Sequence, residues 1–260
     1  MTARAKTVCL TVDMERDCPP YLETWRGVTE GTPLLLALLA AEAVVATFFV
    51  TGELARRFPD TVRAILAAGH EVGSHGDTHA HFGRIGLAKA REEIARSTQT
   101  LRQFCDVSSF RAPYLRFPTA YLPMLEAHGY QLDSSAARYK YPGASVTRAG
   151  GLLRVPASVT SSMLRCPAWL RDAVLRRVRE PAVLFVHPWE FVDLTREQLR
   201  FDCRFKTGEP AHDCLRETIR HFKDRELRFV RMRDFAPRPE TTAGEARDGV
   251  APKRAPGAAR

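Results

Sequence analysis

Two histidines, His75 and His79, lie four residues apart near the end of the run Gly69–His79. This spacing brings both imidazole rings to one side of a helical turn or of a tight loop after a strand, where both can bind one metal ion. A divalent ion with two or three protein ligands keeps positions open for water and substrate, as in hydrolytic sites. The same spacing also arises by chance in pairs of ordinary surface histidines.

Three acidic residues, Asp13, Glu15 and Asp17, occupy alternate positions directly after an apolar run that starts at Thr7. In extended backbone, residues two apart share a face, so Asp13 and Glu15 could serve the same centre, one as a metal ligand and the other as a base. The alternative is a polar loop after a strand whose acids are merely solvated. The nearby histidine pair favours a site.

Two further ionisable side chains also follow apolar runs. Arg111 stands in Phe110–Tyr114, and His187 follows Leu184 and its two apolar successors. A guanidinium can hold a neighbouring carboxylate ionised and oriented, as a general base requires. An imidazole can protonate an amine leaving group near neutral pH. The simpler alternatives are an arginine in a surface turn and a core histidine bonded to backbone.

The elements that must position these residues alternate along the chain, which predicts parallel strands joined by helices. The expected strands are Thr7–Asp13, Val44–Val50, His70–His75, Ser108–Pro113, Tyr130–Ser135, Leu152–Pro156, Ala182–His187 and Leu227–Met232. The expected helices are Pro33–Glu42, Pro59–Ala68, Leu87–Phe104, Thr119–His128, Pro167–Arg179 and His212–Arg225. About eight strands with helical crossovers predict a closed or nearly closed barrel, in which the carboxyl ends of the strands meet at one mouth.

Composition sets the limits of this prediction. The chain has 260 residues and 45% hydrophobic content, enough for a large core in residues 1–236. Residues 237–260 are rich in Ala, Gly, Pro and Arg, which predicts a disordered basic tail. Six cysteines without a Cys-x-x-Cys pair, and an opening that does not read as a secretory signal, favour reduced thiols and a cytoplasmic location. The apolar run Thr32–Val50 divides into a helix and a buried strand, too short for a membrane span.

A net charge of +9 invites comparison with nucleic-acid-binding proteins. The basic residues are spread along the chain without a recognisable binding module, so we expect no nucleic-acid partner. A predicted amphipathic helix within 164–179 concentrates Arg171, Arg176, Arg177 and Arg179 beside Trp169. It is either an ordinary solvated face or a contact for anionic lipid or a phosphorylated substrate.

Taken in order, four segments resemble motifs of the polysaccharide deacetylase family, the carbohydrate esterases with the chitooligosaccharide deacetylase homology domain. They are Thr11–Asp13, Gly69–His79, Phe110–Tyr114 and Leu184–His187. The resemblance extends over residues 7–235, and Ala46–Gly52 is similar to that family's second strand. It implies a distorted, TIM-like (β/α) barrel of seven to eight parallel strands. It also implies a hydrolase with one divalent metal ion, usually zinc, that removes an N-acyl group, above all N-acetyl, from an amino sugar.

The resemblance also implies a role for each matched residue. Asp13 corresponds to the catalytic base, Arg111 to the residue that orients it, and His187 to the acid. His75 and His79 correspond to metal ligands, and the backbone N–H of Tyr114 to an oxyanion donor.

Three departures from the family pattern bear on the ligands and the substrate. The usual adjacent aspartates are replaced by Asp13-Met-Glu15, which makes Glu15 the expected third ligand and Asp17 the alternative. The fourth motif appears only as Asp133-Ser-Ser135, and the histidine strand continues into Pro-Trp-Glu, so the specificity stays open. We expect Tyr114, Trp189 and Trp25 to form walls of the sugar site, with core packing as the alternative.

The substrate prediction rests on the segment Trp25–Pro33, which resembles the subgroup that acts on lipid-linked amino sugars. With the basic helix, it favours a cytoplasmic enzyme, with the option of peripheral contact with the inner face of an anionic membrane, that uses a soluble or lipid-linked glycoside. The competing interpretations are an amidohydrolase or deformylase for a formamido sugar or cyclic ureide, and a metal-free carbohydrate-binding relative. The oligomeric state is not predicted.

Overall fold

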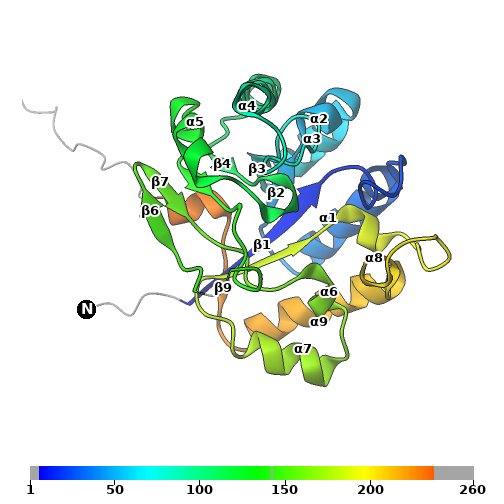
Figure 1. The fold of residues 1–260 in the computed structure, drawn as a ribbon. Helices are drawn as coiled ribbons and strands as arrows, with labels where there is room; N and C mark the ends of the chain where they lie inside the picture. The colour runs from blue at the N-terminus through cyan, green and yellow to red at the C-terminus, as the bar shows by residue number, and fades with distance from the viewer. Residues whose placement is uncertain (1–5, 142, 237–260) are drawn as a thin grey trace, which may run out of the picture.

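A single curled sheet forms the centre of the computed structural model, which describes residues 6–141 and 143–236 (Figure 1). The predicted tail at 237–260 lies outside the described residues. The strand order is β6-β7-β5-β4-β3-β2-β1-β8, with β9 also paired to β1, and every pairing but β6–β7 is parallel. The strands are β1 (Thr7–Met14), β2 (Thr47–Val50), β3 (Glu71–Ser74), β4 (Ser109–Phe110), β5 (Leu132–Asp133), β6 (Thr147–Ala149), β7 (Leu152–Arg154), β8 (Ala182–Val186) and β9 (Arg228–Phe229).

The sheet curls until its two ends nearly meet. The backbone N–H of Ser158, beyond the end of β7, donates to the carbonyl of Val183 in β8 at 2.7 Å. The N–H of Val183 in turn donates to the Ser158 hydroxyl at 2.9 Å. The predicted distorted barrel is therefore confirmed: the mostly parallel sheet is curled into a half-barrel. The antiparallel strand β6 was not predicted, since its three residues are largely solvent-exposed and leave no apolar pattern.

Alternation along the strands separates two apolar layers. In β1, Cys9 belongs to the cluster inside the curl, with Phe49, Val183 and Met232 among its members. Neighbouring residues of β1, such as Leu10, point outward into the larger cluster beneath the helices. Odd-numbered positions of β1, β2 and β8 therefore face the inside of the curl. Asp13 falls on this inner face.

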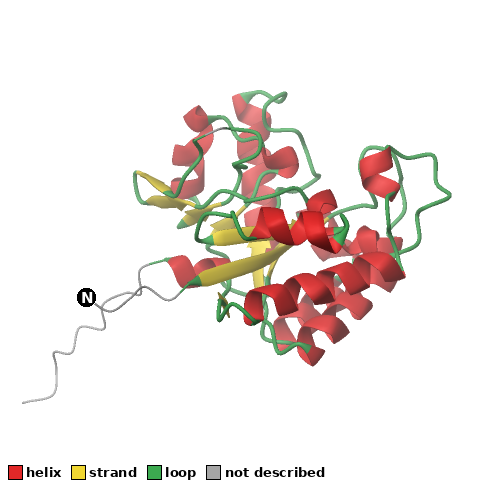
Figure 2. Ribbon diagram, turned by 90° about the horizontal axis from the view of Figure 1, so that it is seen from below, coloured by secondary structure: helices red, strands yellow, loops and turns green. Residues whose placement is uncertain are grey.

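Helices cover the outside of the sheet, with α2 to α5 along one side in Figure 1 and α7 and α9 along the opposite side (Figures 1 and 2). Their bounds are α1 (Thr32–Ala41), α2 (Gly52–Arg57), α3 (Pro59–Ala67), α4 (Leu87–Leu101), α5 (Leu122–Ala127), α6 (Ser161–Leu164), α7 (Ala168–Leu175), α8 (Phe201–Arg204) and α9 (Glu209–Lys223). Single-turn segments add η1 (Gly27–Gly31), η2 (Pro113–Leu115), η3 (Thr119–Tyr121), η4 (Pro188–Phe191) and η5 (Met232–Phe235). The short α2, α6 and α8 were missed, because four to six residues carry too little periodicity.

The apolar run Thr32–Val50 divides as predicted, into α1 and β2. Within the described part of the chain, no helix combines the length and the apolar character needed to cross a membrane.

The predicted basic helix needs one correction. Arg171 is buried, because it pairs with Glu217 at 2.8 Å and with Asp172 at 2.9 Å, so it does not belong to a solvated basic face. Arg176 and Arg177, just beyond α7, are exposed, and Trp169 on the first turn is 74% exposed.

Candidate active site

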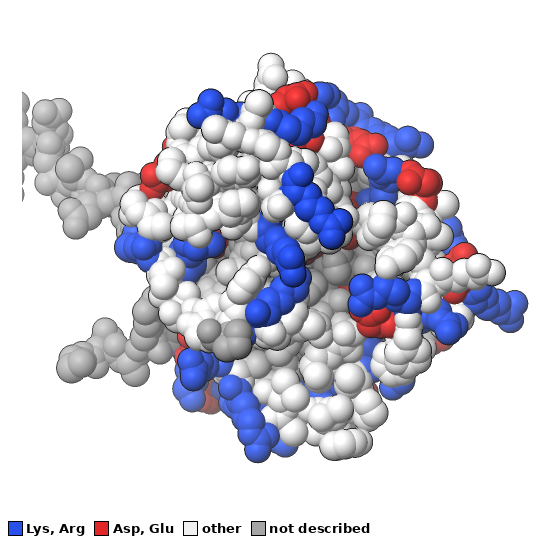
Figure 3. Space-filling model, viewed as in Figure 1, with Lys and Arg blue, Asp and Glu red and all other residues white. Residues whose placement is uncertain are grey.

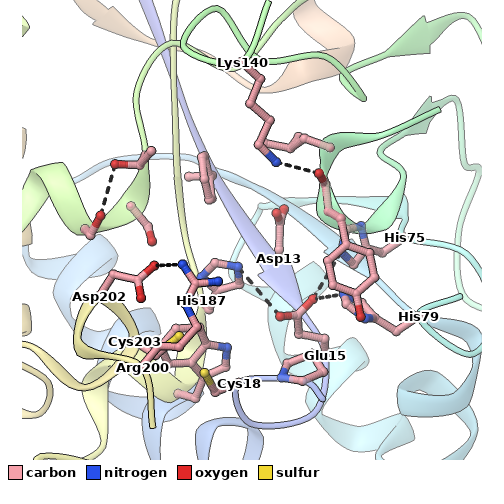
Figure 4. A pocket seen from close by; sticks show the side chains of 18 of the residues that line it. Asp13, Glu15, Cys18, His75, His79, Lys140, His187, Arg200, Asp202 and Cys203 are labelled. Atoms are coloured by element: carbon pink, nitrogen blue, oxygen red, sulfur yellow. Dashed lines mark hydrogen bonds and ion pairs between the residues drawn. The ribbon is translucent and has the colours of Figure 1, made fainter. Parts of the chain in front are cut away.

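Side chains from the ends of β1, β3 and β8 and from the segment after β4 meet in one cavity of about 410 Å³ (Figure 4). The parallel strands direct their carboxyl ends to this mouth, as expected for an α/β barrel. The cavity lining includes the acidic pair Asp13 and Glu15, the histidines His75, His79 and His187, the aromatic residues Tyr114 and Trp189, and the rim residues Cys18, Lys140, Arg200 and Cys203.

Glu15, His75 and His79 have the arrangement of a metal-binding triad. One potential ligand atom from each lies within 4.8 Å of the others. Glu15 Oε2 is 3.3 Å from His75 Nε2 and also contacts His79 Nε2. His75 Nδ1 is 2.8 Å from the carbonyl oxygen of Arg111. A carbonyl only accepts, so Nδ1 carries a proton, and Nε2 is the ring nitrogen that can bind a cation.

The carboxylate of Glu15 is held ionised inside the protein. Burial alone would raise its pKa, but the facing imidazoles of His79 and His75 outweigh this effect and bring the pKa well below its usual range. An anionic oxygen and two imidazole nitrogens form a donor set suited to zinc and related divalent ions. The three residues therefore fit the metal that the family resemblance implies.

The two histidines lie on a loop after β3, not on a helix. Gly76 and His79 have positive φ angles of 77° and 60°, which turn the loop back toward the cavity. The N–H groups of Asp77 and Thr78 each donate to Glu93 Oε2 at 2.9 Å. Glu93, buried on α4, thus fixes the loop. Sequence reasoning missed this residue because it resembles any other glutamate in a charged helix.

Asp13 and Arg111 form a buried pair beside the triad. Arg111 Nη1 donates to Asp13 Oδ1 at 2.7 Å and to the Thr11 hydroxyl at 2.6 Å. Its Nη2 donates to the Ser134 hydroxyl at 2.9 Å, and the guanidinium lies 4.4 Å from the centre of the Phe49 ring. Arg111 thereby holds one oxygen of Asp13 and leaves the other free to accept a proton.

The segment Asp133-Ser-Ser135 supports this pair rather than the acid. Asp133 Oδ2 accepts from Arg154 Nε at 2.8 Å and so is engaged on the sheet. The Ser134 hydroxyl binds Arg111, and the Ser135 hydroxyl accepts the N–H of Ala112 at 2.8 Å. Both serines hold the Arg111 strand end in place, a role that their sequence did not suggest.

His187 has a different carboxylate partner, Glu190. His187 Nδ1 lies 2.7 Å from Glu190 Oε1, and the His187 N–H donates to the same oxygen at 3.0 Å. Glu190 Oε2 pairs with Arg165 Nε at 3.1 Å, and all three residues are largely enclosed. The sequence shows Glu190 in the run Pro-Trp-Glu after His187, but only the tight turn of η4 reveals that it binds the ring.

This partner determines the charge of His187. Burial disfavours the imidazolium, but the hydrogen bond to Glu190 and the charge of Glu15, whose Oε1 is 3.7 Å from His187 Nε2, raise the pKa of His187 to about 9. The ring is therefore protonated at neutral pH, with Nε2–H directed into the cavity. A general acid needs this state before it delivers a proton.

Tyr114 and Trp189 line the cavity as predicted. Tyr114 has the left-handed angles φ 59° and ψ 10°, which place its ring edge-on to His79 at 4.9 Å between centres. Trp189 stacks on His187 at 4.7 Å with 20° between the ring planes. The role of the Tyr114 N–H stays a prediction.

The structure places two of the candidate residues away from the cavity lining. Asp17, the alternative ligand, is fully buried and accepts the N–H groups of Arg26 at 2.7 Å and Gly27 at 2.8 Å, so its oxygens cap η1 instead of facing the triad. Trp25 is buried in the outer core, 5.4 Å from the Phe58 ring, and is absent from the residues that line the cavity. For the Trp25 side chain the structure thus shows the alternative, core packing.

Comparison with known families agrees with this geometry. The model of the family described as polysaccharide deacetylase matches residues 1–132, which include Asp13, Glu15, His75, His79 and Arg111. The chain therefore belongs to the polysaccharide deacetylase family.

Individual relatives match shorter segments. A chitooligosaccharide deacetylase of Sinorhizobium fredii is 36% identical over 86 residues, which cover 32% of this chain and 40% of that protein. A peptidoglycan-N-acetylglucosamine deacetylase of Bacillus cereus is 32% identical over 87 residues, or 33% of this chain and 32% of that protein. The matched part thus spans less than half of these relatives.

The fold similarity extends further than the sequence similarity. A family 4 carbohydrate esterase from Streptomyces lividans, solved in complex with acetate, superposes with a TM-score of 0.59 over 87% of this chain and 93% of that chain, at 19% identity. This likeness establishes the deacetylase barrel fold and leaves the activity to be argued from the site.

Proposed function

We propose that this protein is a metal-dependent hydrolase that removes an N-acetyl group from an amino sugar. The observation that carries the proposal is that Glu15, His75 and His79 face the same cavity as Asp13 and as His187, whose ring is held by Glu190. A ligand set, a held base and a charged acid are the three parts that amide hydrolysis requires. The deacetylase names of the relatives support the same reaction.

The metal proposed is one zinc ion, bound by Glu15, His75 and His79. Zinc bound there would supply a Lewis acid for the amide carbonyl and a water of lowered pKa. All other functions fall to the protein. Asp13, held at one oxygen by Arg111, accepts the proton of the attacking water.

The remaining groups stabilise the negative charge on the amide oxygen and supply the proton that the departing amine needs. The N–H of Tyr114 donates to the amide oxygen as negative charge builds there. His187 gives its Nε2 proton to the departing amine, and Glu190 keeps the ring charged and oriented through Nδ1. Trp189 holds the imidazole plane by stacking.

For the substrate we propose a lipid-linked glycoside, with a soluble glycoside as the simpler case. A groove of about 500 Å³ adjoins the active-site cavity, with Tyr139 and Thr160 in both linings. Its apolar lining comes from Val159, Met163, Val174 and Val178, and Arg138, Arg177 and Arg179 border it. An apolar carrier with a phosphate group matches this combination of surfaces.

The same proposal includes location. We place the protein in the cytoplasm, with peripheral contact at the inner face of an anionic membrane. Trp169, on the first turn of α7, is 74% exposed, and the exposed Arg176 and Arg177 follow the last turn of the same helix. Exposed aromatic and basic residues on one short helix are typical of membrane-surface contacts. Basic side chains also surround the hollowed centre of the face shown in Figure 3.

The experiment is a metal measurement on purified protein followed by an acyl-release assay. Mass spectrometry would follow acetate or formate release from free N-acetylglucosamine, chitooligosaccharides, a polyprenyl-phosphate-linked N-acetylhexosamine and a formamido analogue. We expect bound zinc, and acetate from the lipid-linked sugar. Formate alone would make the protein a deformylase, and metal-free protein without turnover would favour a binding function. Turnover of free sugar with none of the lipid-linked form would overturn the lipid part.

A further inference from the structure

Two cysteines share one wall of the active-site cavity. Cys18 follows β1 in the chain, three residues after Glu15, and Cys203 belongs to α8. Both line the cavity, and Figure 4 shows their sulfur atoms on the same side of it, below His187. The two thiols are unbridged, and Cys203 packs against the apolar cluster that contains Cys18. Segments far apart in sequence thus bring two oxidisable groups to one wall of the cavity and to one apolar cluster.

Both cysteines also contact the structures that hold His187. Cys18 packs in an apolar cluster with Trp189, the residue that stacks on His187. The Cys203 carbonyl accepts from Arg165 Nη1 at 3.3 Å, and Arg165 pairs with Glu190, the partner of His187. A covalent bond between the two sulfurs would therefore act on the stacking partner and on the carboxylate partner of the acid together.

We propose that Cys18 and Cys203 are a modification site, where oxidation by a peroxide forms a reversible disulfide that slows the enzyme. The Cys203 sulfur first attacks the peroxide; one sulfur–oxygen bond forms, the oxygen–oxygen bond breaks, and sulfenic acid and water result. The Cys18 sulfur then attacks the sulfenic sulfur, and its proton leaves with the hydroxyl as a second water. Two thiols are oxidised and one peroxide is reduced.

The order of attack follows from the surroundings of each sulfur. Cys203 is half-buried at the cavity wall, while Cys18 is 2% exposed. Cys203 is therefore the thiol that a peroxide reaches first, and Cys18 is the resolving one.

The first test maps the bond in the full-length, metal-loaded protein. After treatment with hydrogen peroxide and alkylation without reductant, peptide mass spectrometry should find Cys18 joined to Cys203. The other four of the six cysteines should be alkylated. A different pair, or stable sulfinic acid at Cys203 in place of the bond, would overturn the proposal. This readout does not require any catalytic activity.

The second test rests on the proposed function, because it follows acetate release. Peroxide should reduce turnover of the wild-type protein, and dithiothreitol should restore it. Cys203→Ser and Cys18→Ser should each keep, after peroxide, the activity that they had before it. Cys214→Ser on α9, whose thiol is also half-buried but absent from the cavity lining, should lose activity as the wild type does. A mapped disulfide with unchanged turnover would refute the regulatory part alone.

Discussion

Glu190 Oε1 accepts two hydrogen bonds from His187, one from the ring at 2.7 Å and one from the backbone N–H at 3.0 Å. One carboxylate oxygen therefore fixes both the position of the residue and the rotation of its imidazole. The other oxygen faces Arg165 at 3.1 Å, so the carboxylate cannot turn away from the ring. The acid of the proposed reaction is thus prepared by a residue only three positions further along the chain.

Glu190→Gln should reduce the fraction of His187 that is protonated at neutral pH. The pKa of His187 stands at about 9 because its cation is stabilised by Glu190 and Glu15. Without the Glu190 charge the pKa falls, so the alkaline limb of the kcat profile should move to lower pH. At neutral pH turnover should drop by about 10- to 100-fold, as for other orienting partners. A pH–rate series measures both effects.

The matched control is Glu92→Gln, which changes an exposed carboxylate on α4 paired with Lys89 and Arg96. It should leave the pH profile where it is. A Glu190→Gln enzyme whose alkaline limb coincides with that of the wild type would contradict the assignment of His187 as the acid controlled by Glu190.

Metal loading should lower the pKa of His187. Part of its elevation comes from the Glu15 carboxylate, whose Oε1 is 3.7 Å from His187 Nε2. A divalent cation on Glu15 cancels that attraction, so the pKa should fall from about 9 in metal-free protein. Histidine NMR titrations with and without zinc measure the shift. His221, packed against Asp172 and Phe222, should titrate identically in both samples.

His79→Ala and Asp13→Asn should separate metal binding from turnover. Loss of the His79 imidazole removes one of three ligands, so bound metal and activity should both disappear. Asp13→Asn keeps the ligand set and removes the proton acceptor, so metal should stay while kcat falls by about 10²- to 10⁴-fold. Metal content by mass spectrometry, next to acetate release, distinguishes the two cases, with His212→Ala as control. Full activity in either variant would disprove the site.

Arg111→Met should destabilise the fold as well as stop turnover. It leaves the carboxylate of Asp13 and the hydroxyls of Thr11 and Ser134 buried without their donor. Removing one partner of a buried ion pair costs about 3–5 kcal/mol. Ser134→Ala, which removes one neutral contact of the same guanidinium, should cost about 1 kcal/mol. Urea unfolding provides both values, and equal losses would contradict this ranking.

Gly27→Ala should disturb the active site by displacing the backbone of Trp189, a residue that lines the cavity. A Cβ atom at Gly27 would lie 2.4 Å from the backbone nitrogen of Trp189 and 2.8 Å from Asp17 Oδ1. Backbone cannot yield as a flexible side chain does, so we expect a loss of about 1–3 kcal/mol and a displaced Trp189. Tryptophan fluorescence and thermal unfolding report the two effects. Gly86→Ala, with no atom within 4 Å of the new Cβ, is the control.

The sequence predicted the parts of the site that depend on local spacing. The alternation that begins in β1 brings Asp13 and, just beyond the strand, Glu15 to one face, and strand ends bring His75 and His187 to the same mouth. It could not distinguish Asp17 from Glu15, because the difference lies in two N–H groups of Arg26 and Gly27 that only the folded loop presents.

The supporting residues escaped prediction for a related reason. Glu93 on α4 binds the loop that contains Asp77. Arg165, the residue after α6, pairs with Glu190. Such contacts join segments distant in sequence and leave no periodic or motif signal. Trp25 packs in the core and does not line the cavity. The sequence cannot distinguish these two positions, because an aromatic residue near polar motifs occurs in both.

β1 carries Asp13, the proposed base, on its inner face and leads directly into Glu15, the proposed metal ligand, while β2 and β8 pair with its two edges. Deletion of one residue ahead of Asp13 would turn Met14 inward and both acids outward. The rim, by contrast, comes from segments around Lys140 and Arg200 that lie between short elements. We therefore expect loop exchange at the rim to change the substrates that the enzyme accepts, and insertions or deletions in β1 to abolish the chemistry.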